Sequence, residues 1–303
     1  MNSLRYRQVD VFAETPLTGN GLAVFVTDEP LRTEFMQALT RELRQFESIF
    51  LTPTANPDAF SARVFTMEEE LSFAGHPAIG AAAVLHERTG EAAYECQLHL
   101  AAGNVMMTSR RNGEHYCVSM NQGRVSFGEE MPVGCEPAWL NCFGLEPRHL
   151  DPRLPLCIAS TGLPYLLVPV SGDGLARARI VCTDLEERLA TVGAKFAYLF
   201  DCDAREGRTW DNAGSVEDIA TGSAAGPVAG LLVRHGFAGP GEAIALRQGR
   251  FVGRPSEMIA TVRQGCGSEE GDVILSGSVV TVGHGQFDAD LLAHHYPTAS
   301  VTI

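Results

Sequence analysis

Two short stretches of small and apolar residues, about half a chain apart, limit the possible folds of this sequence more than any other feature. Residues 73–85 read FAGHPAIGAAAVL and residues 219–232 read IATGSAAGPVAGLL. Each consists of an apolar lead, a glycine beside a polar residue, and a run of small and aliphatic residues. Because neither run leaves a polar side for solvent, each predicts a buried helix inside layers of strands.

The two stretches are related by an offset of about half the chain. His76 and Ser223 are 223 − 76 = 147 positions apart in a sequence of 303 residues. Such an offset indicates a duplicated domain, because the period of a solenoid is much shorter. A turn-rich, acidic region follows residue 121 and marks the boundary. We expect a first domain at 1–122 plus 288–303 and a second at 123–287.

Strand patterns surround both predicted helices, which predicts an α+β fold. Near the N-terminus, RQVDVF and LAVFV flank the turn TPLTGNG, and residues 32–45 have the spacing of an amphipathic helix. After the second buried helix, IALRQGRFVGRPSEMIATVRQ and DVILSGSVVTVGHGQF read as strand pairs broken by glycine-containing turns. The predicted order is strands, a buried helix and more strands in each half.

The composition excludes several classes of protein. The net charge of −14 disfavours binding to nucleic acid and to anionic membrane surfaces. Lys195 is the one lysine, so a phosphate-binding loop with the pattern GK[ST] is impossible. The eight cysteines form no CxxC pair and no ligand cluster with histidine, which argues against a metal site. We therefore expect a reduced, cytoplasmic protein with no metal.

The starts of the two predicted helices suggest an anion site. A helix that begins at a glycine-rich turn presents free N–H groups, and its dipole favours a negative charge. If both starts faced each other across a domain cleft, they could bind a carboxylate without lysine. His76, Asp218 and Ser223 stand beside them. Taken singly, the histidine could be structural and the other two could be ordinary helix caps.

Glu47 is a further candidate. In QFESIFLTP, the alternation of a strand places Glu47 on the same face as Ile49 and Leu51. Burial in apolar company raises the pKa of a carboxyl toward the range of a general acid or base. The alternative is a glutamate at a strand end that faces solvent.

These residues together resemble one known family. VDVFAETPLTGNGLAVF, the ES-IF of residues 47–50, ELSFAGHPAIGAA, STGLPYLLVPV, EDIATGSAAGPVAGLL and QGRFVGRPS are similar, in order and spacing, to the phenazine-biosynthesis isomerase (PhzF) family. The resemblance spans nearly the whole chain, and FAGHPxxG and DxATGSAxG are its specific motifs. It implies the diaminopimelate-epimerase-like fold: two similar domains, each a curled, barrel-like mixed or antiparallel sheet around a central helix, with the active site in the cleft between them.

The resemblance also implies roles for individual residues. Glu47 matches the catalytic proton carrier of the family, and His76 and Asp218 match polar residues that hold the substrate and assist the transfer. The implied activity is a cofactor-independent isomerisation that moves a proton on a small unsaturated carboxylate, by a chain expected to form a homodimer. The implied substrate-binding residues are Asn20, Gly75, Gly222 and Ser223.

Two other functions stay open. A racemase or epimerase of the same fold would need two opposed thiols at the helix starts, where this chain has Ala74 and Thr221. A non-catalytic carboxylate-binding protein is the second alternative. Ile219, Gly21 and Phe46 depart from the residues common in the family and would alter the shape of the pocket, so the substrate itself is open.

Overall fold

The computed structural model describes residues 4–129, 131–132, 134–263 and 271–288. It divides into two units, of which the first holds residues 1–118 and 278–303 and the second holds 119–277. The chain passes from one unit to the other within the strands β8 (His115–Arg124) and β16 (Asp272–Phe287). Of the C-terminal segment 288–303 expected in the first domain, all but Asp288 lies outside the described residues.

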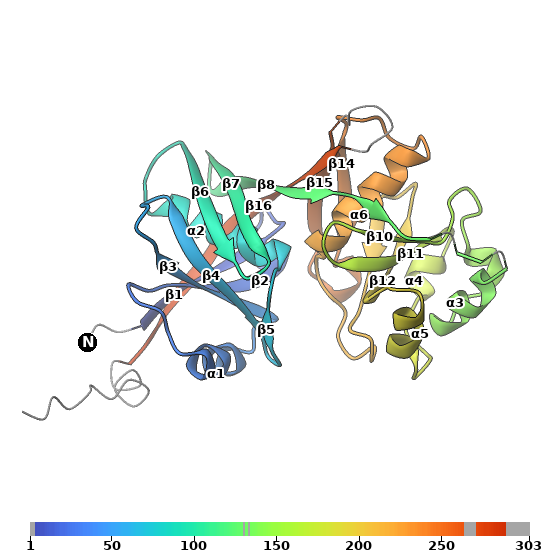
Figure 1. The fold of residues 1–303 in the computed structure, drawn as a ribbon, viewed down its shortest axis with the longest axis horizontal. Coiled ribbons are helices and arrows are strands. Elements are labelled where there is room, and N and C mark those ends of the chain that lie inside the picture. Colours follow the sequence, from blue (N-terminus) through green and yellow to red (C-terminus); the bar gives the residue numbers. More distant parts are fainter. Residues whose placement is uncertain (1–3, 130, 133, 264–270, 289–303) are drawn as a thin grey trace, which may run out of the picture. The chain divides into compact units, whose positions relative to one another are not determined.

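The first unit is a mixed sheet that closes on itself (Figure 1). The strand order is β1-β2-β3-β4-β6-β7-β8-β16, and β1 pairs with β16 to complete the ring. The pairs β2–β3 and β4–β6 are parallel, whereas β1–β2, β3–β4 and β6–β7 are antiparallel. Its further elements are β1 (Leu4–Val11), β2 (Asn20–Val26), α1 (Thr33–Leu43), β3 (Glu47–Pro53), β4 (Ala59–Thr66), β5 (Glu70–Leu71), α2 (Gly75–Glu87), β6 (Ala93–Leu100) and β7 (Gly103–Asn112).

The second unit repeats the plan with more helices on its outside. Its strands follow the order β16-β15-β14-β13-β12-β11-β10-β9, with parallel pairs at β11–β12 and β13–β14. The elements are β9 (Ser126–Phe127), α3 (Glu136–Cys142), the 3-10 helix η1 (Pro147–His149), β10 (Cys157–Ser160), β11 (Pro164–Val170), α4 (Gly174–Arg177), α5 (Leu185–Thr191), β12 (Phe196–Asp201), β13 (Glu206–Arg208), α6 (Gly222–Arg234), β14 (Ala243–Gln248), the 3-10 helix η2 (Arg250–Val252) and β15 (Ser256–Val262).

The two small-residue stretches form the central helices of the two units. α2 and α6 each have 13 residues, and they start 222 − 75 = 147 positions apart. Every residue of α2 from Gly75 to His86 is buried, and α2 packs against β1, β2 and β3. α6 packs against β10, β11 and β15. The predicted α+β fold of two similar curled sheets around central helices is therefore confirmed.

Strand β3 is buried on both faces because a helix covers each of them. Phe50 belongs to an apolar cluster with Phe35, Met36 and Leu39 of α1, and its ring stacks on Phe25 at 4.6 Å between centroids. Alternate residues point the other way, toward α2. Glu47 lies on that second face, so its carboxylate points toward α2.

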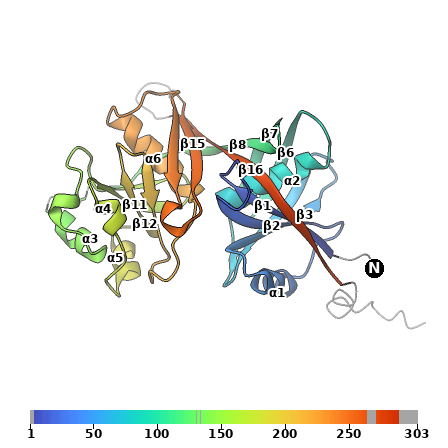
Figure 2. The same cartoon turned by 180° about the vertical axis from the view of Figure 1, so that it is seen from behind.

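One prediction about the strands was wrong. DVILSGSVVTVGHGQF is a single strand, β16, rather than a pair broken by turns (Figure 2). Its glycines do not break the strand, because Gly283 and Gly285 themselves pair with residues of β1. Helix α3 was also missed, inside the region expected to be turn-rich.

None of the helices that the structure describes has the length and apolar character needed to cross a bilayer.

Small residues let α2 approach the sheet closely. A Cβ added to Gly80 would stand 2.4 Å from Leu22 Cδ2 and 3.0 Å from Val11 Cγ2. Both neighbours are fully buried, so neither side chain has free space into which to move. Glycine at this position is therefore set by packing.

Replacing Gly80 by alanine tests this packing. In an uncrowded helix the change would stabilise by about 0.5–1 kcal/mol. We expect G80A instead to lower the free energy of unfolding by about 1–3 kcal/mol, as overpacking does, measured by urea denaturation. G283A is the control, since a Cβ there would meet no atom within 4 Å. A G80A protein as stable as the wild type would contradict the close approach.

Candidate functional site

The structure brings Glu47 and His76 together in the first unit. Glu47 is the first residue of β3 and His76 is the second residue of α2. Glu47 Oε2 lies 3.4 Å from Nδ1 of His76. The two residues are only 7 % and 6 % exposed, respectively. The strand alternation read from the sequence is thus confirmed for Glu47, which points into the unit and not to solvent.

His76 is held as a neutral imidazole. Burial lowers the pKa of His76 to about 3, far below its ordinary value. Its Nε2 atom is buried and has no hydrogen-bond partner among the described residues. The pair therefore carries at most the single charge of the carboxylate near neutral pH.

The start of α2 supplies backbone donors beside this pair. Ala74 precedes the helix in extended conformation and makes no side-chain cap. Because residue 77 is proline, the first turn carries just the N–H groups of Gly75 and His76. Together with the helix dipole, they favour a negative charge at this end of the helix.

Asn20 opens the neighbouring strand β2 and is 1 % exposed. Leu22, two residues on, pairs with Glu47 across the parallel β2–β3 ladder. Residues at i and i+2 share a face of a strand, and the side chain of Leu22 faces Gly80 of α2. Asn20 therefore lies on the α2 side of the sheet, as Glu47 does.

The remaining predicted residues belong to the second unit, at the start of α6. Asp218 is half-buried, and its Oδ2 accepts a 2.5 Å hydrogen bond from the Thr221 hydroxyl. The N–H of Asp218 donates to the carbonyl of Thr209 at 3.0 Å. Asp218 is thus fixed at both its backbone and its side chain, and Thr221 is the residue that precedes α6.

Gly222 and Ser223 form the first turn of α6. The Gly222 carbonyl accepts a 2.8 Å hydrogen bond from Nε2 of Gln122. The Ser223 hydroxyl lies 2.6 Å from the hydroxyl of Tyr165. The N–H groups of this turn resemble those at α2, including the absence of a side-chain cap from the preceding residue.

Sequence reasoning missed three polar residues that support this second cluster. Gln248 bonds to both Asp218 and Thr221, Tyr198 bonds to Gln248, and Tyr165 bonds to Ser223. The signal was present for two of them, since QGRFVGRPS begins at Gln248 and STGLPYLLVPV contains Tyr165. For Tyr198, in the strand sequence KFAYLF, nothing distinguished a hydrogen-bonding tyrosine from an apolar core residue.

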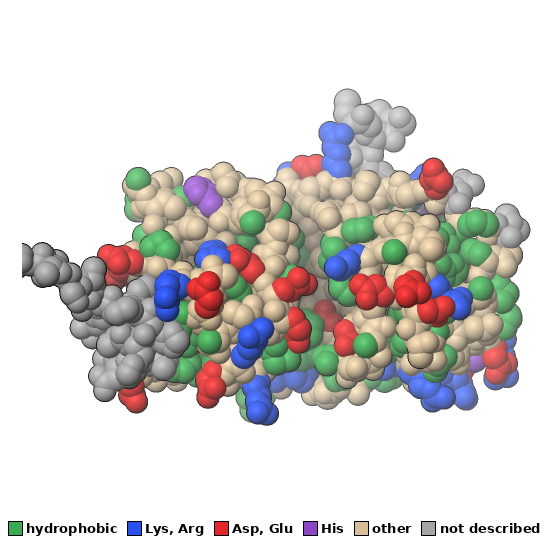
Figure 3. All heavy atoms as spheres, turned by 60° about the horizontal axis from the view of Figure 1, so that its bottom comes forward, with side chains coloured by type: hydrophobic (Ala, Val, Ile, Leu, Met, Phe, Trp, Pro, Cys, Tyr) green, Lys and Arg blue, Asp and Glu red, His purple; other side chains and the backbone are tan. Residues whose placement is uncertain are grey.

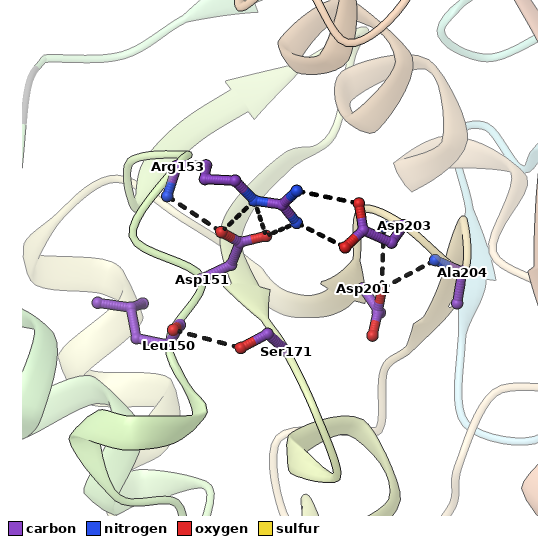
Figure 4. A network of polar contacts seen from close by, with 7 residues as sticks. All are labelled: Leu150, Asp151, Arg153, Ser171, Asp201, Asp203 and Ala204. Carbon is purple, nitrogen blue, oxygen red and sulfur yellow. Dashed lines mark hydrogen bonds and ion pairs between the residues drawn. The ribbon is translucent and has the colours of Figure 1, made fainter.

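A separate cluster of aspartates does not form a metal site. Arg153 lies between Asp151 and Asp203, bonding to them at 2.6 and 2.8 Å (Figure 4). The hydrogen bonds from Arg153 lower the pKa of Asp151. Arg153 pairs with both carboxylates, and no group of three or more possible ligands for a metal ion is found in the described part of the chain.

The surface of the described residues carries charges of both signs. On the face shown in Figure 3, acidic side chains are interspersed with the basic ones rather than separated from them. With 37 acidic and 23 basic residues in the whole chain, a phosphate backbone would meet net repulsion.

Comparison with known proteins identifies the family. The family model described as phenazine biosynthesis-like protein (PhzC-PhzF) matches residues 9–285. A trans-2,3-dihydro-3-hydroxyanthranilate isomerase from Pseudomonas aeruginosa is 34% identical over 301 residues, covering 93% of this chain and 98% of its own. The enzyme of the same name from Pseudomonas fluorescens is 32% identical over 288 residues, with 92% and 98% coverage.

Solved structures agree in fold. A predicted epimerase from Pseudomonas aeruginosa is 50% identical, with a TM-score of 0.88 and coverage of 94% of this chain and 99% of that one. A hydroxyproline epimerase from Agrobacterium vitis, 14% identical, has a TM-score of 0.60 with 95% and 93% coverage, and it shows a shared fold alone. The chain therefore belongs to the phenazine biosynthesis-like (PhzC-PhzF) family and is an isomerase with the diaminopimelate-epimerase-like fold.

Proposed function

We propose that this isomerase moves a proton within a small unsaturated carboxylate, with Glu47 as its acid and base. The observation that carries the proposal is the buried pair of Glu47 and His76 beside the N–H groups of α2. The names of the relatives from Pseudomonas support a substrate of the class of trans-2,3-dihydro-3-hydroxyanthranilate. Ile219, Gly21 and Phe46 differ from the family pattern, so the substrate here is proposed as a class.

The pair suits a single-base mechanism. Glu47, as carboxylate, takes a proton from carbon and returns it to another atom on the same face of the substrate. His76, whose pKa burial lowers to about 3, is too weak a base to take that proton from Glu47. The proton therefore stays with the carboxyl until it is returned, and His76 orients the pair.

The helix starts suit the charge that develops. When carbon loses a proton, negative charge spreads into the conjugated system, and N–H groups already aimed at it lower the barrier. Gly75 and His76 supply such groups in the first unit. We assign the binding of the substrate carboxylate to Gly222 and Ser223, and the binding of a polar substituent to Asp218 and Asn20.

The rival chemistry of a two-thiol racemase has no support in these residues. Such an enzyme needs a proton carrier on each side of a planar carbanion. Ala74 and Thr221, which precede α2 and α6, have no acidic thiol. A non-catalytic binding protein would not need a buried carboxylate beside a neutral histidine.

The wider expectations belong to the same proposal: an enzyme of the cytoplasm, active as a homodimer and without cofactor. The described cysteines support the first of these, because all seven are free thiols, as in a reducing compartment. The isomerase relatives and the single-base pair support the cofactor-free reaction.

Replacing Glu47 by glutamine tests the proton carrier. E47Q keeps the size of the side chain and removes its basicity, so turnover should fall by about 10²–10⁴-fold while substrate still binds. The measurement is deuterium uptake from D₂O by unsaturated amino and hydroxy acids, starting with trans-2,3-dihydro-3-hydroxyanthranilate. E114Q, at an exposed glutamate, is the matched control. Wild-type rates in E47Q would remove Glu47 from the mechanism.

The neutral state of His76 predicts a pH dependence of stability. Between pH 6.5 and about 3, the unfolded chain binds a proton at this imidazole while the folded chain does not. Folding stability is therefore lost as pH falls through this window, by up to about 1.4 kcal/mol for each pH unit. Below pH 3 both states are protonated and the loss stops growing.

Unfolding by urea from pH 7 to 4 checks this effect. Because Glu47 touches His76, the comparison is between E47Q and the double variant E47Q/H76Q, in which the acid loss should be smaller. H235Q, at an exposed histidine, serves as the control in the same background. Equal acid losses with and without His76 would mean that the imidazole charges freely in the folded protein.

A further inference from the structure

Gln248, the last residue of β14, uses its whole amide group beside Asp218. It is 1 % exposed. Its Nε2 lies 2.8 Å from the Asp218 carbonyl and 2.9 Å from the Thr221 hydroxyl. Its Oε1 lies 3.1 Å from the Thr221 nitrogen and 3.0 Å from the Tyr198 hydroxyl. Two donors and two acceptor positions are thus all in use.

The backbone decides which way this amide points. The N–H of Thr221 can only donate, so the atom that faces it must be the oxygen of Gln248. The carbonyl of Asp218 can only accept, so the atom that faces it must be the nitrogen. The orientation of the amide therefore follows from chemistry as well as from the coordinates.

The direction of the next hydrogen bond follows. The second N–H of Gln248 donates to the hydroxyl oxygen of Thr221. That hydroxyl must then give its own hydrogen elsewhere, and Oδ2 of Asp218 lies 2.5 Å away. A distance this short is typical of a hydroxyl bonded to a charged carboxylate.

Tyr198 completes the chain at its other end. Burial raises the pKa of Tyr198 above its usual range, so this hydroxyl keeps its hydrogen. It donates that hydrogen to Oε1 of Gln248. The hydrogens therefore point in one direction, from Tyr198 to Gln248 and from Gln248 through Thr221 to Asp218.

We propose that Gln248 is a positioning residue, which forces the Thr221 hydroxyl to donate to Asp218 and so keeps Asp218 a hydrogen-bond acceptor toward the substrate. An acceptor at this position would bind a hydroxyl or amino substituent of the substrate, a small molecule that also carries a carboxylate. The choice of ligand rests on the proposed function of Asp218. The direction of the hydrogen bonds does not.

Several charged groups lie around Gln248. Glu206 and Arg250 form an ion pair, with 2.7 Å between Nη2 and Oε2. Both line, with Arg247 and Gln248, a cavity of about 300 Å³. Asp218 lies on the α6 side. A carboxylate placed at position 248 would thus meet one arginine–glutamate pair, one further arginine and the like charge of Asp218.

The test replaces Gln248 by glutamate and, as a packing control, by methionine. As a carboxylate, the introduced group can only accept, so it competes with Asp218 for the Thr221 hydrogen. Once protonated, it can donate again. Q248E should therefore lose deuterium uptake into trans-2,3-dihydro-3-hydroxyanthranilate by about 10- to 100-fold at pH 8 and recover it as pH falls. The ratio of Q248M to the wild type should not change with pH.

Proton NMR gives a readout that needs no substrate. In the wild type we expect the Thr221 hydroxyl proton, held in its hydrogen bond to Asp218, to exchange slowly enough with water to give a signal of its own. The signal should be absent in T221V, present in T221S, lost in Q248E at pH 8 and regained at lower pH. T221V removes the donated hydrogen without adding a charge, so it tests the same bond if Q248E does not fold.

The outcomes separate the two proposals. A wild-type signal that survives unchanged in Q248E at pH 8, or no such signal in the wild type, would overturn the role of Gln248. Equal behaviour of Q248E and Q248M at every pH would overturn it as well, because packing alone would then explain both. A wild type that takes up no deuterium into any compound would overturn the proposed function, while the NMR signals still decide the direction of the bonds.

Discussion

Both units depend on one packing constraint: a helix of small residues enclosed by a curled sheet. Interiors of proteins are packed as densely as organic crystals, so a helix with bulky side chains would push the strands apart. In α2 the alanines and Gly80 keep the helix close to β1 and β2. In α6, Gly226 meets Gln122 and Gly230 meets Val125 in the same way. The fold therefore requires the composition that first distinguished these stretches.

Enclosing a helix also fixes where its polar start lies. A helix whose sides are wholly apolar can present polar groups only at its ends. In α2, the N–H groups of Gly75 and His76 remain at the start because Ala74 cannot cap them. In α6, Thr221 could cap, but its hydroxyl is bonded to Asp218 instead. The packing that builds each unit thus leaves the polar groups of the helix at its start.

Most of the fold and part of the site could be predicted from the sequence, for physical reasons that differ. The small and apolar composition located both central helices, because a fully buried helix has no polar side, and the offset of 147 related the two. Strand alternation located Glu47 on the α2 side. The unbroken strand β16 could not be predicted, since glycine permits a turn without requiring one. The motif QGRFVGRPS marked Gln248, but its role could not be predicted, because folding brings its partners to it.

The two clusters differ in how they control protons, and the difference follows from their surroundings. Around His76, burial dominates: it lowers the pKa of the imidazole to about 3 although the Glu47 carboxylate lies 3.4 Å away. Around Asp218, directed hydrogen bonds act: Gln248 and Thr221 hold the carboxylate as an acceptor. Hydrogen-bond donors favour the charged form of a carboxyl group and lower its pKa. Many donors therefore suit a carboxylate that only binds a ligand, and few suit one that must also take up a proton. This difference supports the proposal that Glu47 is the proton carrier and Asp218 is a binding residue.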